Sequence, residues 1–201
     1  QTQGLDKRLT SQTFTELVIS AMVYVFLDMV CGLQQNQVIH LSVFISTILN
    51  TAFFISSYSL THLSFAFTEC ELGRDWVSEP KKRMISLIPA GLLTITTLCT
   101  LKWHFFFYID AEGIYQRGPL YLVVLPFVYI YMIMIVFRMV TMFPKKKYYA
   151  FRGKLEMVVG IVGFPLVAGV LQVFLPGISV VCFGLTLGVI QAFTAFLTNR
   201  I

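Results

Sequence analysis

Six long runs of apolar residues constrain the fold of this chain more than any short motif does. An α-helix needs about 20 apolar residues to cross the hydrocarbon core of a membrane. Lipid supplies no hydrogen bonds, so the backbone of each crossing segment must satisfy its own polar groups. The runs predict helices at about residues 14–33, 38–66, 84–101, 119–140, 155–175 and 178–198. We therefore expect an all-α fold, a polytopic transmembrane bundle of six membrane-spanning helices that forms a single domain over residues 1–201.

Composition agrees with a membrane protein. Hydrophobic residues make up 57% of the chain, charged residues make up 12%, and the mean hydropathy is +0.77. Soluble domains carry about 25% charged residues, so about half of that charge is missing here. What remains is concentrated between the apolar runs, as expected for loops on either side of a bilayer.

The position of the basic residues predicts the orientation in the membrane. If the N-terminal segment lies inside, all but two of the 15 Lys and Arg residues lie on that side, the exceptions being Lys102 and Arg117. An excess of Lys and Arg in cytoplasmic loops sets membrane topology, so both termini are predicted to be cytoplasmic. The net charge of +5 is then expected to meet anionic lipid headgroups rather than nucleic acid.

Two connecting segments have distinct characters. The inner loop at 68–83 is polar, and we interpret it as a solvated connector. The outer loop at 102–118 reads KWHFFFYIDAEGIYQRG, in which Asp110 and Gly113 occupy the first and fourth positions of a turn. Two β-prone runs flank that turn. The outer loop therefore predicts a short hairpin that caps the outer mouth of the bundle.

The outer loop is also the candidate ligand site. Tyr108, Asp110, Tyr115 and Arg117 combine aromatic rings with charges of both signs, a mixture that suits a small polar ligand. The arginine can present paired donors to a carboxylate or phosphate, or it can neutralise a nearby acid. The alternative is an aromatic belt at the membrane interface, which needs no ligand.

Asp28 is the only acidic residue well inside an apolar run. An ionisable group within a membrane is costly and is by default a hypothesis for a functional site. We place it at the floor of the outer ligand site. The alternative is a hydrated structural position, because Asp28 lies only one or two turns from the predicted outer end of its helix.

Small residues mark the last predicted helix. Gly184 and Gly188 have the G-x-x-x-G spacing that lets two helix backbones approach closely. They are expected to pack against either the preceding helix or a second copy of the chain, so a homodimer is one alternative. A disulfide between Cys31 and Cys99 is another alternative that spacing leaves open.

Motifs of catalysis and metal binding are absent. The chain has no HExxH, no GxSxG, no phosphate-binding glycine loop and no Cys/His spacing typical of a metal site. No enzymatic activity, no cofactor and no metal are therefore expected within these residues.

The second half of the chain resembles a known family. The stretch YIDAEGIYQRGPLY and the later stretch FPLVAGVLQVFLPGISVVCFGLTLGVIQAFTAFLTNRI are similar, in that order, to the N-terminal membrane region of bacterial GGDEF proteins, which are diguanylate cyclases. The likeness covers about residues 104–201, and extends more loosely to the first half through helix spacing and Asp28. It implies a sensor of usually seven helices in a bacterial cytoplasmic membrane, with one helix missing from this chain.

The resemblance also implies how the domain works. A stimulus outside or within the membrane would change helix packing, and the last helix would pass this change to a cytoplasmic GGDEF output, which the chain itself lacks. The alternatives are a small transporter or channel, which would need a wet path from Asp28 to His62, and a membrane scaffold without a small-molecule role.

Overall fold

The computed structural model describes residues 2–73, 75–142, 152–174 and 180–198. It is mostly helical, as expected from the apolar runs. The elements are α1 (Thr2–Gln35), α2 (Val43–Glu71), the 3-10 helix η1 (Asp75–Ser78), α3 (Pro80–Ser86), α4 (Ile88–Trp103), β1 (Phe107–Ile109), β2 (Tyr115–Arg117), α5 (Tyr121–Val128), α6 (Ile130–Met142), α7 (Arg152–Phe174) and α8 (Val180–Thr198).

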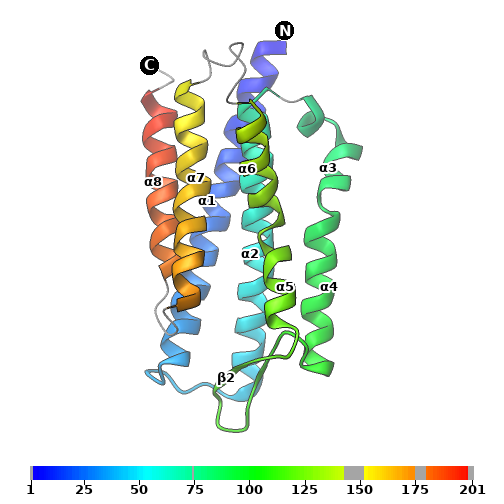
Figure 1. The fold of residues 1–201 in the computed structure, drawn as a ribbon, viewed down its shortest axis with the longest axis vertical. Helices are drawn as coiled ribbons and strands as arrows, with labels where there is room; N and C mark the ends of the chain where they lie inside the picture. The colour runs from blue at the N-terminus through cyan, green and yellow to red at the C-terminus, as the bar shows by residue number, and fades with distance from the viewer. Residues whose placement is uncertain (1, 74, 143–151, 175–179, 199–201) are drawn as a thin grey trace.

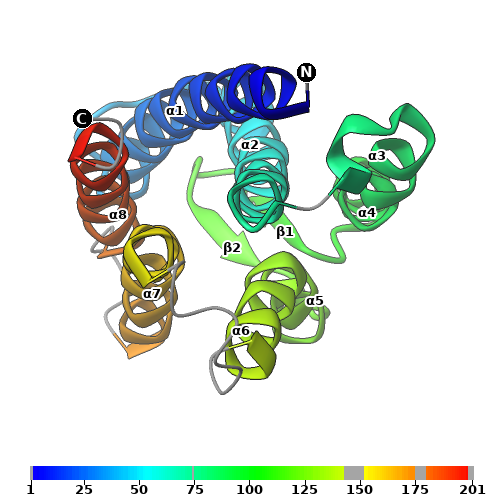
Figure 2. The same cartoon turned by 90° about the horizontal axis from the view of Figure 1, so that it is seen from above.

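The helices run along the long axis of an elongated bundle (Figure 1). The start of α1 and the end of α8 lie at one end, which we call the terminal end, and the β1–β2 hairpin lies at the other, the hairpin end. Seen from the terminal end, α1 packs beside α2 and α7 packs beside α8 (Figure 2). The hairpin lies across the opposite end, where β1 contacts α2 and α4.

Length and composition identify fewer spans than the sequence predicts. Two helical segments, Arg8–Gln35 and Val43–Glu71, are long and apolar enough to cross a membrane. The count reaches four if the pair α3–α4, bent by 42°, and the pair α5–α6, bent by 45°, each form one span. The apolar stretches found in α7 and α8 are shorter, at Val158–Leu171 and Val180–Thr194. Six spans are therefore not confirmed, although a helix lies at each predicted position within the described residues.

Two predicted helix ends need correction. The polar segment before residue 14 is helical from Thr2, because nothing in it breaks the helix that the apolar run begins. The second helix starts later than predicted, at Val43, because the Ser42 hydroxyl caps it by accepting from the Ile45 N–H at 3.4 Å. Several Ser and Thr hydroxyls of α2 donate to carbonyls of the preceding turn, as Ser64 does to Leu60 at 2.9 Å.

The prediction of a solvated connector at 68–83 is wrong for the first part of the segment, whereas residues 78–82 are exposed as predicted. Helix α2 continues to Glu71, and Glu69 is only 1% exposed. One oxygen of the Glu69 carboxylate accepts from the Trp76 indole N–H at 2.8 Å, and the other lies 3.6 Å from Arg138 Nε of α6. The Trp76 ring stacks on Phe65 at 5.6 Å between centroids. The segment therefore folds back on the bundle, since a buried carboxylate needs such partners.

Candidate functional site

The hairpin pairs β1 and β2 in antiparallel register, with Phe107 opposite Arg117, Tyr108 opposite Gln116 and Ile109 opposite Tyr115. Successive side chains of a strand point to opposite faces. Phe107 is 1% exposed, and its ring stacks on Phe54 of α2 at 5.3 Å and on Tyr115 at 5.8 Å. The face that carries Phe107 and Tyr115 is thus the one packed against the helices.

Tyr108 lies on the other face of the hairpin. It is exposed, and its ring lies 5.4 Å from the ring of His104. The predicted site placed Tyr108 together with Tyr115 and Arg117, and the structure does not bring these three together. The cause is the period of two along β1, which turns Tyr108 away from its neighbour Phe107.

Asp110 shapes the turn. Its Oδ1 accepts from the Ile114 N–H at 2.9 Å and the Glu112 N–H at 3.0 Å, and its Oδ2 accepts from Gln116 Nε2 at 3.1 Å. These bonds stabilise the ionised carboxylate, so the pKa of Asp110 is lowered, mainly by the Ile114 N–H. Gly113 completes the turn with a φ of +82°. The geometry supports the predicted hairpin and gives Asp110 a structural role.

Arg117 and Tyr115 border α5. The Arg117 guanidinium lies over the Tyr121 ring, 4.9 Å from its centroid, in a cation–π contact. Arg117 is exposed, and the ion pairs seen in the described part of the chain do not include it. Tyr115 is partly buried, and burial raises the pKa of its hydroxyl. The guanidinium therefore lies at the exposed surface of the hairpin end, beside the Tyr121 ring.

Asp28 lies inside the bundle, where it is 8% exposed. Its carboxylate is hydrogen-bonded to the thiol of Cys182 on α8. Tyr24 and Cys31, one turn before and after it on α1, lie close enough to interact with it electrostatically. Asp28 thus faces protein rather than lipid, and it connects the first helix to the last.

Cys31 links this carboxylate to the hairpin. It is 3% exposed and interacts electrostatically both with Asp28 and with Tyr115. Tyr115 interacts in turn with Arg117. Four of the predicted or neighbouring groups, each within electrostatic range of the next, therefore lead from the hairpin into the bundle, and we call them the polar series: Arg117, Tyr115, Cys31 and Asp28. Cys31 and Cys99 are free thiols, so the alternative disulfide does not form.

Two residues that anchor the hairpin were not predicted. Gln34, at the end of α1, donates from Nε2 to the Gly113 carbonyl at 2.7 Å, and its Oε1 accepts from Asn50 Nδ2 at 3.4 Å. Both side chains are buried, at 5% and 1% exposed. The sequence offered only a weak signal, since Gln34 is one of three glutamines near the turn and Asn50 is one of many polar residues of α2.

Gly184 and Gly188 pack within the chain. A Cβ atom at Gly184 would lie 2.5 Å from Ala168 Cβ and 2.6 Å from the Phe164 carbonyl oxygen. One at Gly188 would lie 2.7 Å from the Gly160 carbonyl oxygen. All of these atoms belong to α7, so the first of the two predicted alternatives, contact with the preceding helix, describes both glycines.

Comparison with known proteins identifies a family. Residues 4–201 match the family model described as the N-terminal 7TM region of histidine kinase. No curated protein and no solved structure matches the chain. The match supports a membrane sensor region, but the predicted association with GGDEF proteins is not supported. The resemblance depended on the order of two stretches of the membrane region, and such stretches do not specify the output that follows them.

Proposed function

The chain belongs to the family of N-terminal 7TM regions of histidine kinases. From this premise we propose that it detects a small polar ligand at the hairpin end and signals through α8 to a histidine kinase. A region of this family is a non-catalytic membrane sensing domain that relays to an output domain. The ligand, its binding site and the signalling route through α8 are our proposal. We also propose that the chain crosses the membrane six times with both termini in the cytoplasm. The unequal distribution of Lys and Arg supports that orientation.

The contact between Asp28 and Cys182 carries this proposal. It joins α1 to α8 near the hairpin end through a buried hydrogen bond. A ligand that engages the Asp28 carboxylate would compete with the thiol for it. Because α8 otherwise packs mainly on α7, the loss of this bond would change how α8 is held. A ligand must bind the two packing states differently to shift their populations, and this bond gives it a way to do so.

The polar series suggests the kind of ligand. Asp28 favours a group that donates hydrogen bonds or carries positive charge, whereas Arg117 favours an acceptor or an anion. The hydroxyls of Tyr24, Tyr121 and Tyr129 lie within electrostatic range of this region. We infer a small ligand with a donor end toward Asp28 and an acceptor end toward Arg117. Tyr108, on the other face of the hairpin, is outside this revised site.

Phosphorylation tests the relay directly. The chain would be joined through the end of α8 to a histidine kinase catalytic region, and its autophosphorylation measured in membranes. Asp28→Ala and Cys182→Ala each remove the bond between α1 and α8, so both should change the basal rate in the same direction. Phe44→Ala, at a side chain 73% exposed on the outer surface, is the matched control and should leave the rate unchanged. Equal rates in all four proteins would contradict the proposed route.

The alternative of a transporter or channel gains no support from the geometry. A transporter or channel needs a water-filled path between Asp28 and His62. Asp28 contacts α8, whereas the His62 ring lies 3.0 Å from the Ser86 hydroxyl at the α3–α4 break. Within the described residues, the two ionisable groups thus belong to separate sets of contacts. We therefore favour a sensor over a transporter or channel.

A further inference from the structure

The backbone hydrogen bond between residues 86 and 90 of a continuous helix is missing between α3 and α4. In an unbroken α-helix the Ala90 N–H would donate to the Ser86 carbonyl, four residues earlier. Instead, the Tyr131 hydroxyl of α6 lies between them. It accepts from the Ala90 N–H at 3.1 Å and donates to the Ser86 carbonyl at 2.6 Å. Regular helical bonding resumes with the Gly91 N–H and the Leu87 carbonyl at 2.8 Å.

Pro89 explains only part of this break. Proline has no N–H and its ring clashes with the carbonyl four residues earlier, which here belongs to Ile85. The bond between Ser86 and Ala90 is a separate one that proline leaves chemically intact. A side chain inserted into the backbone ladder is itself a recognised cause of a sharp bend. Besides Pro89, the Tyr131 hydroxyl is thus a second candidate cause of the 42° bend between α3 and α4.

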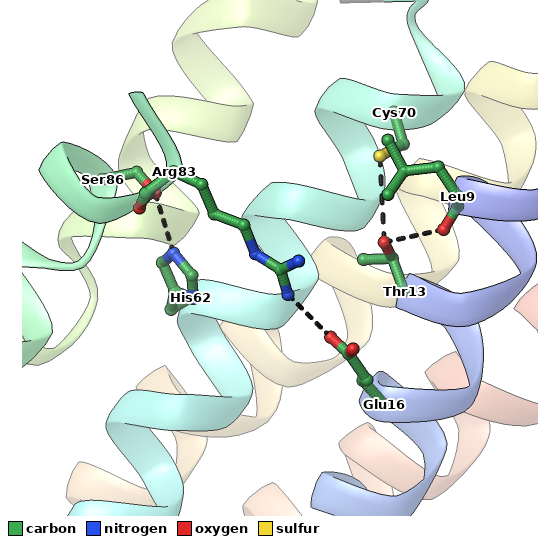
Figure 3. Close-up of polar contacts among 7 residues, drawn as sticks. All are labelled: Leu9, Thr13, Glu16, His62, Cys70, Arg83 and Ser86. Carbon is green, nitrogen blue, oxygen red and sulfur yellow. Dashed lines mark hydrogen bonds and ion pairs between the residues drawn. The ribbon is translucent and has the colours of Figure 1, made fainter. Parts of the chain in front are cut away.

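The surroundings of Tyr131 hold it in place. The residue is 1% exposed. Its ring meets the His62 ring edge-on, with centroids 5.3 Å apart, and the Phe65 ring at 5.7 Å. The Ser86 hydroxyl donates to the Arg83 carbonyl at 2.7 Å, so it accepts from His62 Nε2 at 3.0 Å (Figure 3). Groups from α2 and α6 therefore converge on the last residue of α3.

We propose that the Tyr131 hydroxyl is a hydrogen-bonded wedge that keeps α3 bent away from α4 and makes the position of α3 depend on α6. When α6 withdraws the hydroxyl, the Ala90 N–H and the Ser86 carbonyl can bond to each other, and the helix straightens. Leaving both groups buried and unsatisfied would cost more than closing that bond. The break is therefore an element with two stable arrangements, set by one side chain.

The wedge would act on the terminal end of the bundle. Arg83 of α3 donates to Glu16 of α1 at 3.0 Å, so a swing of α3 would change its contact with α1 (Figure 3). Helix α6 follows α5, whose Tyr121 lies under Arg117 of the hairpin. This gives a second route between the two ends of the bundle that does not pass through α8. It is independent of the identity of the ligand and of the Asp28–Cys182 bond.

Distances between spin labels in the purified chain in lipid nanodiscs test the wedge. Labels on cysteines at Lys81 of α3 and Ile19 of α1, in a background with all four native cysteines changed to serine, report the swing of α3. All label positions are exposed. The arm from Lys81 to Leu87 is about 9 Å long at the helical rise per residue. If it loses the 42° bend, its tip moves by up to about 6 Å. Labels at Leu101 and Ile19 should keep their distance.

Three variants separate the wedge from the proline. Tyr131→Phe keeps the ring against His62 and should shift the Lys81–Ile19 distance by several Å. Pro89→Ala keeps the Tyr131 hydroxyl, so the helix pair should stay bent and the Lys81–Ile19 distance should stay as in the wild type. Tyr129→Phe removes a hydroxyl two residues away and should also leave it unchanged. The wedge is refuted if Tyr131→Phe keeps the bent distance or if Tyr129→Phe shifts it equally. Should Tyr131→Phe not fold, Pro89→Ala still decides, because straightening in that variant alone would make the proline the cause.

Discussion

The carboxylate of Asp28 on α1 is hydrogen-bonded to the thiol of Cys182 on α8. The two residues are far apart in the sequence, and they bring the first and last described helices together near the hairpin end. At the terminal end the same helices meet again, where the rings of Phe14 and Phe193 stack with centroids 6.5 Å apart. Helix α8 is therefore positioned by α1 at both ends, and a change at Asp28 affects one of the two contacts.

A double-mutant cycle should measure the coupling between these residues. Asp28→Ala, Cys182→Ala and the double variant would be unfolded in detergent, and their free energies of unfolding compared with the wild type. Residues in direct contact show interaction energies of about 0.5–3 kcal/mol, so the double variant should lose less stability than the two single losses added. Strict additivity would show that the bond does not contribute. Asp28 paired with Phe44, whose side chain is 73% exposed, is the matched control, for which additivity is expected.

Acid should loosen the hairpin turn. The three bonds that Asp110 accepts favour its ionised form and lower its pKa below the ordinary value of 3.8. A group with a lowered pKa in the folded state contributes stability above its ordinary pKa, and that stability is lost as the pH falls through the lowered value. The protection of the Ile114 amide hydrogen, measured as its exchange rate relative to the intrinsic rate at the same pH, should therefore fall below about pH 4.

Asp110→Ala should accelerate that exchange at neutral pH too, because the acceptor is gone. Glu112→Ala removes a nearby acid whose side chain holds none of these three bonds, so it is the control and should exchange like the wild type. Identical exchange in Asp110→Ala and wild type would mean that Gln34, through the Gly113 carbonyl, is sufficient to order the turn.

Local signals in the sequence predicted the helices and the hairpin, because each depends on neighbours in the chain. The turn at Asp110 and Gly113 is an example, since both residues act within a few positions of each other. Signals that depend on distant contacts were missed. Glu69 looked like one of several acids in a polar loop, and only Trp76 folding back and Arg138 of α6 explain its burial.

The candidate site was predicted in part for the same reason. Composition identified Asp28, Tyr115 and Arg117, but it gave no information on which face of the hairpin each occupies, so Tyr108 was included. The partner of Asp28, Cys182, lies on another helix, and no spacing along the sequence connects the two. The break at Ser86 was also invisible, because its cause is a hydroxyl from α6.

Labelling in intact cells should establish the sidedness that the basic residues predict. Single cysteines at Glu112 in the hairpin turn and at Lys81 in α3 would be treated with a membrane-impermeant thiol reagent, after replacement of the native cysteines. Both positions are exposed, and the hairpin and α3 lie toward opposite ends of the bundle (Figure 1). Glu112→Cys should react at once, and Lys81→Cys only after the membrane is permeabilised. Reaction of Lys81→Cys alone in intact cells would reverse the orientation.

Bulk at Gly184 and Gly188 should damage the fold of a single chain. Added Cβ atoms would lie 2.6 Å from the Phe164 carbonyl and 2.7 Å from the Gly160 carbonyl, and backbone cannot move aside as a flexible side chain can. Overpacking typically costs about 1–3 kcal/mol at each site. The variant with leucine at both positions should therefore unfold at a lower temperature or detergent concentration than the wild type. Gly163→Ala is the matched control, because its Cβ would meet only Val159 at an ordinary 3.8 Å.

The same variant distinguishes packing within the chain from self-association. If the glycines pack on α7, as these contacts indicate, the leucine variant loses stability. This surface then forms no dimer in the wild type, so it makes no contribution to any dependence of the elution volume on protein concentration. If the glycines instead joined two copies of the chain, the variant would keep its monomer stability and lose only a dimer that the wild type forms. A folded, fully stable monomer of the leucine variant would therefore overturn the assignment of α7 as the partner of α8 at this contact.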